Sequence, residues 1–164
     1  MDPFTVVNHI RRHSPLVANR LLDRLIVPRI IPLARGLKLK VEESTDLRCV
    51  LSMPVSKRSR NHLGTMYFGA QMTLIDLTVG VLLFQRFPMG PFGGVIKRVE
   101  TNFLIKAKGT IHCTCELDVA TIDHLEAVRT SESGKVEGWV PFKLVDEKQQ
   151  VVTDGRVQVA IKRF

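Results

Sequence analysis

The sequence contains one isolated carboxylate in an apolar segment. Asp76 is the only formal charge between Gly69 and Gln85. Burying a carboxylate is costly unless it is paired, hydrogen-bonded or open to a cleft. Two interpretations follow. Asp76 is either a structural residue bonded to backbone amides, or a general base or nucleophile that acts on a carbonyl group. Partial burial would raise its pKa and make it a stronger base.

A helix start is the second chemical feature. The amides of Phe68 and Gly69 would have no partner inside the helix and would carry the positive end of its dipole. Either amide is predicted to stabilise negative charge that develops on a carbonyl oxygen. Asp76 follows Gly69 by seven residues, about two helical turns, which places both on one face with Thr73 between them. Gly80 follows one turn later, so this face carries little bulk.

The surrounding segments predict one long helix and several strands. Residues 69–86 are apolar nearly all round, which indicates burial on most sides. Alternating apolar and polar residues predict a hairpin over residues 37–53 and strands over 95–106, 110–120, 135–145 and 151–162. Residues 123–131 are predicted to form a short helical turn, since Asp123 and Glu126 have capping-box spacing.

These elements define an α+β fold. Short connections make neighbouring strands antiparallel, and a helix that is apolar on all sides is buried only if the sheet curls around it. We therefore expect the hotdog fold, in which a curved antiparallel sheet of about six strands wraps one central helix. One sheet edge would stay open, and pairing with a second copy would cover it. A homodimer is expected, and a tetramer is compatible with the pattern.

The first part of the chain is a basic, amphipathic arm. Asp2-Pro3 and Ser14-Pro15 are helix-start signals, Pro28 and Pro32 interrupt the helical pattern, and Gly36 ends the segment. We therefore divide the chain into an arm over residues 1–36 and a hotdog domain over 37–164. The arm is expected to cover one end of the sheet, with contact to a membrane as the alternative.

Charge and cysteine content narrow the classes of protein. Residues 1–60 hold 12 Lys/Arg and 5 Asp/Glu, whereas residues 61–164 hold 12 and 11, so the net charge of +8 is concentrated at the start of the chain. Few aromatic residues accompany it, which argues against nucleic-acid binding. No metal-ligand spacing is present, and Cys49, Cys113 and Cys115 are expected to be reduced core residues. The beginning of the chain lacks the pattern of a signal peptide, which favours a cytoplasmic location.

The pattern Asn61-x-x-Gly64-x-x-Tyr67-Phe68-Gly69, with Asp76 in the following helix, resembles hotdog-fold acyl-CoA thioesterases. The likeness is to the phenylacetyl-CoA thioesterase type and its relatives grouped as a domain of unknown function (DUF4442), and it covers residues 37–164. The segment 101–109 is also similar to the strand after the helix in those enzymes.

The resemblance implies roles for particular residues. Asp76 would be the catalytic base or nucleophile, and Asn61 would place water or substrate. The family's His-Gly-Gly helix start falls on Tyr67-Phe68-Gly69, which differs at the first two positions while leaving the amides in place. A later family hydroxyl falls on Ile96, which cannot form a hydrogen bond.

The expected substrate is an acyl-CoA or an acyl-carrier thioester, with no separate cofactor and no metal. Tyr67, Gly64 and Thr73 are candidate substrate contacts. Nearby basic residues are candidates for binding the CoA phosphates, namely Lys57, Arg58, Arg60, Lys106 and Lys108. The alternative is a hotdog protein that binds acyl groups or acyl-CoA without hydrolysing them, which the apolar Phe68 and Ile96 would suit.

Overall fold

A computed structural model describes residues 3–164, without the side chains of Phe4 and Thr5. The helices are α1 (Pro3–Arg11), α2 (Pro15–Leu21), α3 (Val27–Ile30), α4 (Phe68–Arg86) and α5 (Val119–Glu126). A π-helical turn (Leu22–Ile26) joins α2 to α3. The strands are β1 (Lys40–Ser44), β2 (Arg48–Pro54), β3 (Phe92–Phe103), β4 (Thr110–Glu116), β5 (Lys135–Val145) and β6 (Val151–Arg163).

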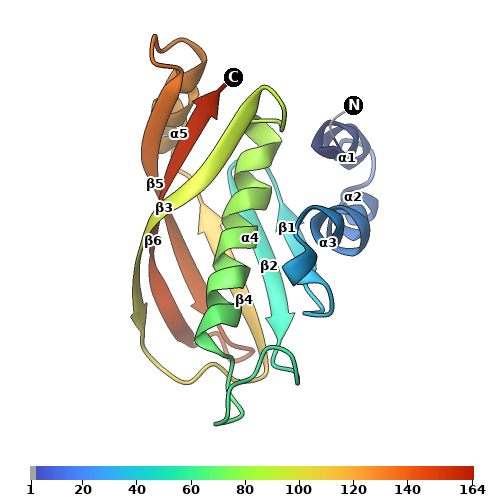
Figure 1. Cartoon of the computed structure of the whole chain (residues 1–164). Coiled ribbons are helices and arrows are strands. Elements are labelled where there is room, and N and C mark those ends of the chain that lie inside the picture. The colour runs from blue at the N-terminus through green and yellow to red at the C-terminus, as the bar shows by residue number, and fades with distance from the viewer. Residues whose placement is uncertain (1–2) are drawn as a thin grey trace.

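The six strands form one antiparallel sheet in the order β1-β2-β4-β5-β6-β3. The sheet curves around α4, which runs along its concave side (Figure 1). This is the hotdog architecture predicted from the sequence. Cys49, Cys113 and Cys115 are buried free thiols in this sheet, as expected.

The central helix is held by its apolar residues and by polar contacts near its two ends. Leu74, Ile75 and Leu82 are almost completely buried between α4 and the sheet. Near the start of α4, the buried Gln71 side chain accepts a 2.6 Å hydrogen bond from the Thr153 hydroxyl on β6. The helix is long and apolar enough to cross a membrane by length and composition alone, but more than half of it is buried inside the fold.

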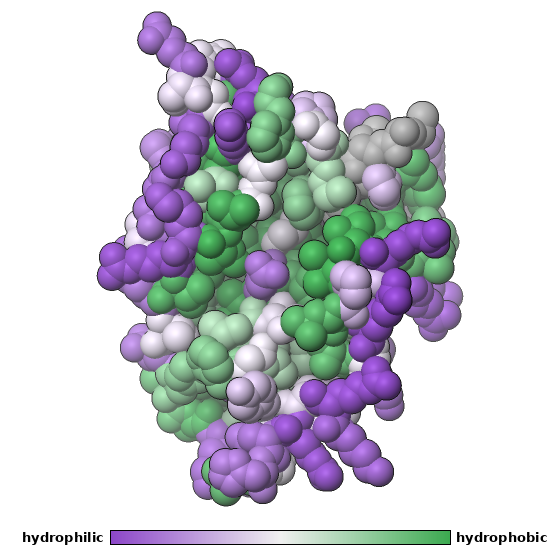
Figure 2. All heavy atoms as spheres, in the orientation of Figure 1, coloured by the Kyte–Doolittle hydropathy of each residue, from purple (hydrophilic) through white to green (hydrophobic). Residues whose placement is uncertain are grey.

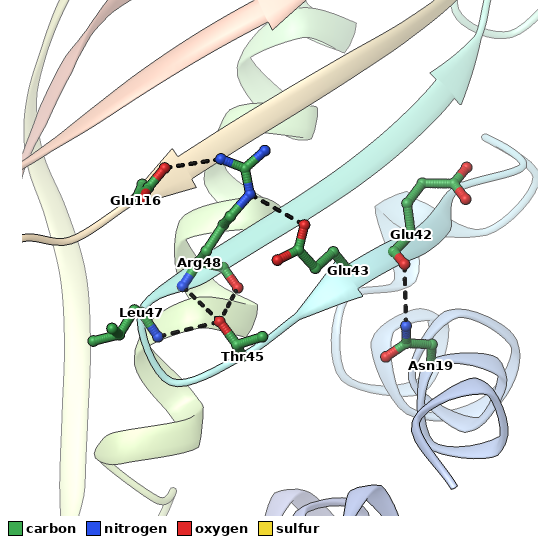
Figure 3. Close-up of polar contacts among 7 residues, drawn as sticks. All are labelled: Asn19, Glu42, Glu43, Thr45, Leu47, Arg48 and Glu116. Carbon is green, nitrogen blue, oxygen red and sulfur yellow. Dashed lines mark hydrogen bonds and ion pairs between the residues drawn. The ribbon is translucent and has the colours of Figure 1, made fainter.

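The N-terminal helices lie along the β1 side of the molecule (Figure 1). Asn19 in α2 donates a 3.3 Å hydrogen bond to the Glu42 carbonyl of β1, as Figure 3 shows. Asn8 in α1 donates to the Gln85 carbonyl near the end of α4. Figure 3 also shows Arg48 of β2 joining Glu43 of β1 to Glu116 of β4. The arm therefore covers the β1 edge of the sheet.

The opposite edge is different. Among the described strands, β3 pairs only with β6, and its other side is open. Val95, Val99 and Phe103 on this strand are 65%, 39% and 49% exposed. An edge strand with exposed apolar side chains is a surface on which a further strand can pair.

One local prediction holds in part and another was wrong. Pro28 lies just after the point where a π-helical turn interrupts the α-helical pattern, but the helical segment continues, because Pro28 is in the first turn of α3, where a missing N–H is tolerated. The helix after β4 begins before Asp123, because Asp118 caps it by accepting a hydrogen bond from the Thr121 amide.

Candidate functional site

Asp76 lies in an apolar hollow on the exposed side of α4. The hollow has a volume of about 370 Å³, and Asp76 is the only ionisable side chain lining it among residues 3–164. Its walls come from α4, from β3 with β6, and from α3 of the arm. The size and apolar lining are typical of a site for a small apolar group.

The α4 wall has a gap at Gly80. Asp76, Gly80 and Phe84 are spaced four residues apart, so they follow one another on one helix face. A Cβ at Gly80 would meet only the Phe84 ring, at 3.8 Å. The missing side chain at Gly80 therefore provides part of the free space beside the carboxylate.

The opposite walls come from β3 and from the arm. Gly94, Val95 and Ile96 precede a β-bulge in β3 and face the hollow together with Val159 of β6. Val27, Ile30 and Ile31 close the third side. Ile96, at which the resemblance predicts the family hydroxyl, lines the same hollow as Asp76 and contributes an apolar surface.

The environment of Asp76 alters its acidity. Solvent reaches the side chain, but the surrounding apolar residues desolvate the carboxylate and raise its pKa above the usual aspartate value. No ion pair with Asp76 occurs among the described residues. A carboxylate that is accessible and has a raised pKa is suited to accept a proton from water.

The start of α4, outside the hollow that contains Asp76, provides hydrogen-bond donors. Tyr67 is the N-cap residue, and its side chain forms no cap hydrogen bond. Within the described chain, the amides of Phe68 and Gly69 have no hydrogen-bond acceptor. Thr73 donates its hydroxyl hydrogen back to the Gly69 carbonyl at 2.8 Å. These free amides can stabilise an oxyanion.

Two loops fix the position of this helix start. The Tyr67 amide donates to the carbonyl of the buried Ser59 at 2.7 Å, and the Met66 amide donates to the Ala107 carbonyl at 2.9 Å. Both Tyr67 and Phe68 are 55% exposed, and the Phe68 ring packs edge-on against Phe103 with centroids 5.7 Å apart. The helix start is thus rigidly held, with an aromatic surface beside it.

Asn61 organises the loop before the helix. Its Oδ1 accepts hydrogen bonds from the Leu63 and Thr65 amides, and its Nδ2 donates to the Thr65 hydroxyl. Gly64 completes the turn with a positive φ of 74° that favours glycine. The second Nδ2 hydrogen of Asn61 has no acceptor among the described residues.

The five candidate basic residues are all exposed and gather at this end of the molecule. The loops that carry them are tied together by the hydrogen bond from the Val55 amide to the Gly109 carbonyl. Figure 2 shows this end, below the start of α4, covered by hydrophilic side chains. The residues are Lys57, Arg58, Arg60, Lys106 and Lys108.

The predicted site residues therefore form two groups. Asn61, Gly64, Tyr67, Phe68, Gly69 and the basic residues lie around the helix start, whereas Asp76 lies in the apolar hollow. With a rise of 1.5 Å per residue, Gly69 and Asp76 are roughly 10 Å apart along the helix axis. The helix-start amides and the Asp76 carboxylate therefore belong to positions about two helical turns apart on α4.

Sequence reasoning missed the contribution of the arm to the hollow. Val27, Ile30 and Ile31 have the helical spacing of ordinary core residues, and nothing in that spacing indicates that they face Asp76. Phe84 could have been found, because it continues the four-residue spacing from Asp76 and Gly80.

Comparison with protein families gives one match. The family described as "Domain of unknown function (DUF4442)" matches residues 19–161. No curated protein matches the chain.

Solved structures of thioesterase-like proteins have the same fold. A protein of unknown function from Pseudomonas aeruginosa, described as a probable thioesterase, is 29% identical, with a TM-score of 0.77 over 92% of this chain and 97% of that chain. A Staphylococcus aureus thioesterase is 21% identical, with a TM-score of 0.65 over 80% and 98% of the two chains. A hypothetical thioesterase from Streptococcus pneumoniae, solved with coenzyme A, is 15% identical, with a TM-score of 0.59 over 77% and 87%.

Proposed function

Since the chain belongs to the DUF4442 family and has the fold of thioesterase-like proteins, we propose that it hydrolyses acyl-CoA thioesters with Asp76 as the base or nucleophile. The observation that carries the proposal is the place of Asp76, an accessible carboxylate with a raised pKa in a hollow otherwise lined by apolar groups. Such a carboxylate takes a proton from the water that attacks the thioester carbonyl, or attacks the carbonyl itself to form a mixed anhydride that water then hydrolyses. In both routes the carbon–sulfur bond breaks, and the CoA thiolate takes up a proton and leaves as its thiol.

The acyl group binds in the apolar hollow beside Asp76. A thioester has an apolar acyl part and a polar, phosphorylated CoA part, and the molecule offers an environment for each. The hollow takes the acyl part, while the basic residues around the helix start take the phosphates of CoA. Coenzyme A is bound in the solved structure of the Streptococcus pneumoniae relative, which supports a CoA ester as substrate.

A homodimer would complete the site. The helix-start amides and Asp76 of one chain are separated by roughly 10 Å along the helix axis, and a partner protomer would bring a second helix start closer to this carboxylate. Pairing two β3 edges would cover Val95, Val99 and Phe103 and bring the helix start of one protomer towards Asp76 of its partner. In this arrangement the Phe68 or Gly69 amide binds the oxyanion and the partner's Asp76 activates water.

The spacing between Asn61 and Asp76 in the sequence supports the proposed roles of these two residues. In the Staphylococcus aureus protein, a glutamine and a glutamate 15 positions apart have been replaced by alanine in separate structures. Asn61 and Asp76 are also 15 positions apart. We assign Asn61 the role of placing the attacking water or the substrate with its remaining Nδ2 hydrogen.

Hydrolysis of a panel of acyl-CoA esters, followed by release of the free CoA thiol, tests this function. The wild type is expected to turn over at least one ester, and Asp76→Asn to lose at least about 10²-fold in kcat, the lower range for loss of a general base. Asp123→Asn is the matched control, because Asp123 is exposed on α5, away from the hollow. Equal rates for Asp76→Asn and the wild type would refute the assignment.

Binding without turnover is the second candidate function. It is favoured by Ile96, which gives the hollow an apolar surface at the position of the family hydroxyl. Saturable binding of acyl-CoA by the wild type, with no thiol release for any ester, would establish this alternative.

A further inference from the structure

The outer side of the N-terminal arm exposes large apolar side chains. Leu16 in α2, Leu25 in the π-helical turn and Leu33 in the short 3-10 turn after α3 (Pro32–Ala34) are 75%, 59% and 69% exposed, although the arm buries Ala18, Leu22 and Val27. The arm therefore has an apolar inner side that is used for packing and further leucines on its outer side. The leucines on the outer side therefore stay exposed in the folded chain.

Arginines alternate with these leucines. Arg20, Arg24 and Arg29 are exposed on the same helical segment. Every ion pair in residues 3–164 joins side chains from Glu43 onward, so these three arginines are in none of them. By contrast, Arg48 on the sheet binds two glutamates. Asp23 attracts Arg20 and Arg24 without forming an ion pair with them, so the positive charge of the arm is only partly offset within the protein.

The π-helical turn brings these side chains to one side. Here the Val27 amide donates to the Leu22 carbonyl, five residues back. A wide turn of this kind inserts one residue and delays the helix rotation by roughly 100°. Arg24 and Leu25 consequently stay on the face that Leu16 and Arg20 begin. In Figure 2, hydrophobic and hydrophilic side chains are interleaved on the side where Figure 1 places α1 to α3.

A groove of about 520 Å³ lies beside this face, between the arm and β1. Four cations line it, Arg20, Arg24, Lys38 and Lys40, against the two carboxylates Asp23 and Glu42. The excess of positive charge next to exposed leucines gives an anionic group a place to bind.

We propose that the outer face of the arm, defined by Leu16, Arg20, Arg24, Leu25 and Arg29, docks on the surface of an anionic lipid bilayer. The leucines insert at the boundary between headgroups and acyl chains, while the guanidinium groups bind lipid phosphates. A lipid surface fits better than an acidic protein, because the leucines are separated by arginines and form no continuous apolar patch for a protein partner. This docking does not depend on the proposed hydrolysis.

Sedimentation of the full-length protein with vesicles tests the proposal. We expect binding to phosphatidylcholine vesicles that contain phosphatidylglycerol, weaker binding at high salt, and little binding to phosphatidylcholine alone. The double variant Arg20→Gln/Arg24→Gln should lower the partition coefficient roughly fivefold for each arginine. Leu16→Ser/Leu25→Ser should also lower it several-fold at constant salt.

Matched controls separate the arm from general surface effects. Leu63→Ser/Val119→Ser removes similarly exposed apolar side chains elsewhere, and Lys143→Gln/Lys148→Gln removes exposed positive charges from the sheet domain. Both controls should bind vesicles like the wild type, and both arm variants should keep their circular dichroism spectrum. The proposal is overturned if the leucine variant binds as well as the wild type, which would indicate a purely electrostatic contact, or if a control variant loses as much binding as the arm variants.

Discussion

The start and the middle of α4 differ in almost every physical property. At the start, free amides, an N-cap residue and five basic side chains make a positive, polar environment held by two loops. In the middle, Asp76 is surrounded by apolar groups from three elements. The first region is suited to bind negative charge, and the second is suited to hold an apolar group beside a weakly acidic carboxyl.

The difference shows how one helix can contribute to both halves of a reaction. A carbonyl needs an oxyanion donor on one side and a nucleophile or base on the other. Because both regions lie on one rigid helix, their separation within a chain is fixed. Two antiparallel copies of the helix would place unlike regions next to each other.

Among the variants below, removal of one backbone N–H from the start of α4 should have the largest effect on kcat. Gly69→Pro deletes the N–H in the first turn, where proline is compatible with a helix, and should lower kcat about 10²- to 10³-fold. Gly69→Ala is the matched control, since its Cβ meets the same Tyr67 ring atoms, at 2.8 Å, but the amide remains. Steady-state kinetics compare the two, and similar losses for both would indicate crowding by the new side chain.

Mixed dimers test whether the two regions act across protomers. When Asp76→Asn and Gly69→Pro chains are combined, each heterodimer should contain one intact site and recover about half the wild-type rate. Differently tagged chains purified as heterodimers provide the measurement. No recovery above the parent variants would show that each chain uses its own helix start and its own Asp76.

Filling the hollow should change the specificity for acyl length more than the rate of the hydrolytic step. Gly80→Val adds a side chain beside Asp76, and we expect about a tenfold loss of kcat/KM for longer acyl groups with little change for acetyl-CoA. Gly80→Ala places only one methyl group 3.8 Å from the Phe84 ring, so its kcat/KM for longer acyl groups should lie between the values for the wild type and for Gly80→Val. A uniform loss for every acyl length would place the acyl group elsewhere.

The smallest expected effect concerns stability and its dependence on pH. Since burial raises the folded-state pKa of Asp76, the wild type should lose stability as pH rises from the unfolded-state pKa near 4 through the folded-state value. Asp76→Asn should lack this loss and be more stable at neutral pH by less than about 1 kcal/mol, because solvent reaches the carboxyl. Urea unfolding at several pH values measures the difference, which should vanish in acid.

The fold could be predicted because its main signals are local. Alternation in the strands and the all-round apolar pattern of α4 depend on which residues are buried, and burial follows residue type closely. Asp118 shows the limit, since Asp123 and Glu126 have capping-box spacing in the sequence, whereas in the structure Asp118 caps the helix by accepting the Thr121 amide.

The site was harder to predict because it depends on the distances between its residues in the folded structure. The sequence correctly indicates that Asp76 and Gly69 share a helix, but a shared face still leaves them about two turns apart. The roles of Val27 and Ile30 depend on where the arm docks, which is fixed by long-range contacts such as that between Asn19 and Glu42. No spacing in the sequence encodes those contacts.

The arm over β1 also limits how far the protein can assemble. A sheet with two free edges can add copies at both ends and grow into a fibre. In this chain the Glu42 carbonyl of β1 already accepts a hydrogen bond from Asn19, and the N-terminal helices cover the β1 edge of the sheet. A further strand can therefore pair only with β3. Joining two copies through β3 would use that edge in both of them, so edge-to-edge association of this kind would stop at a pair.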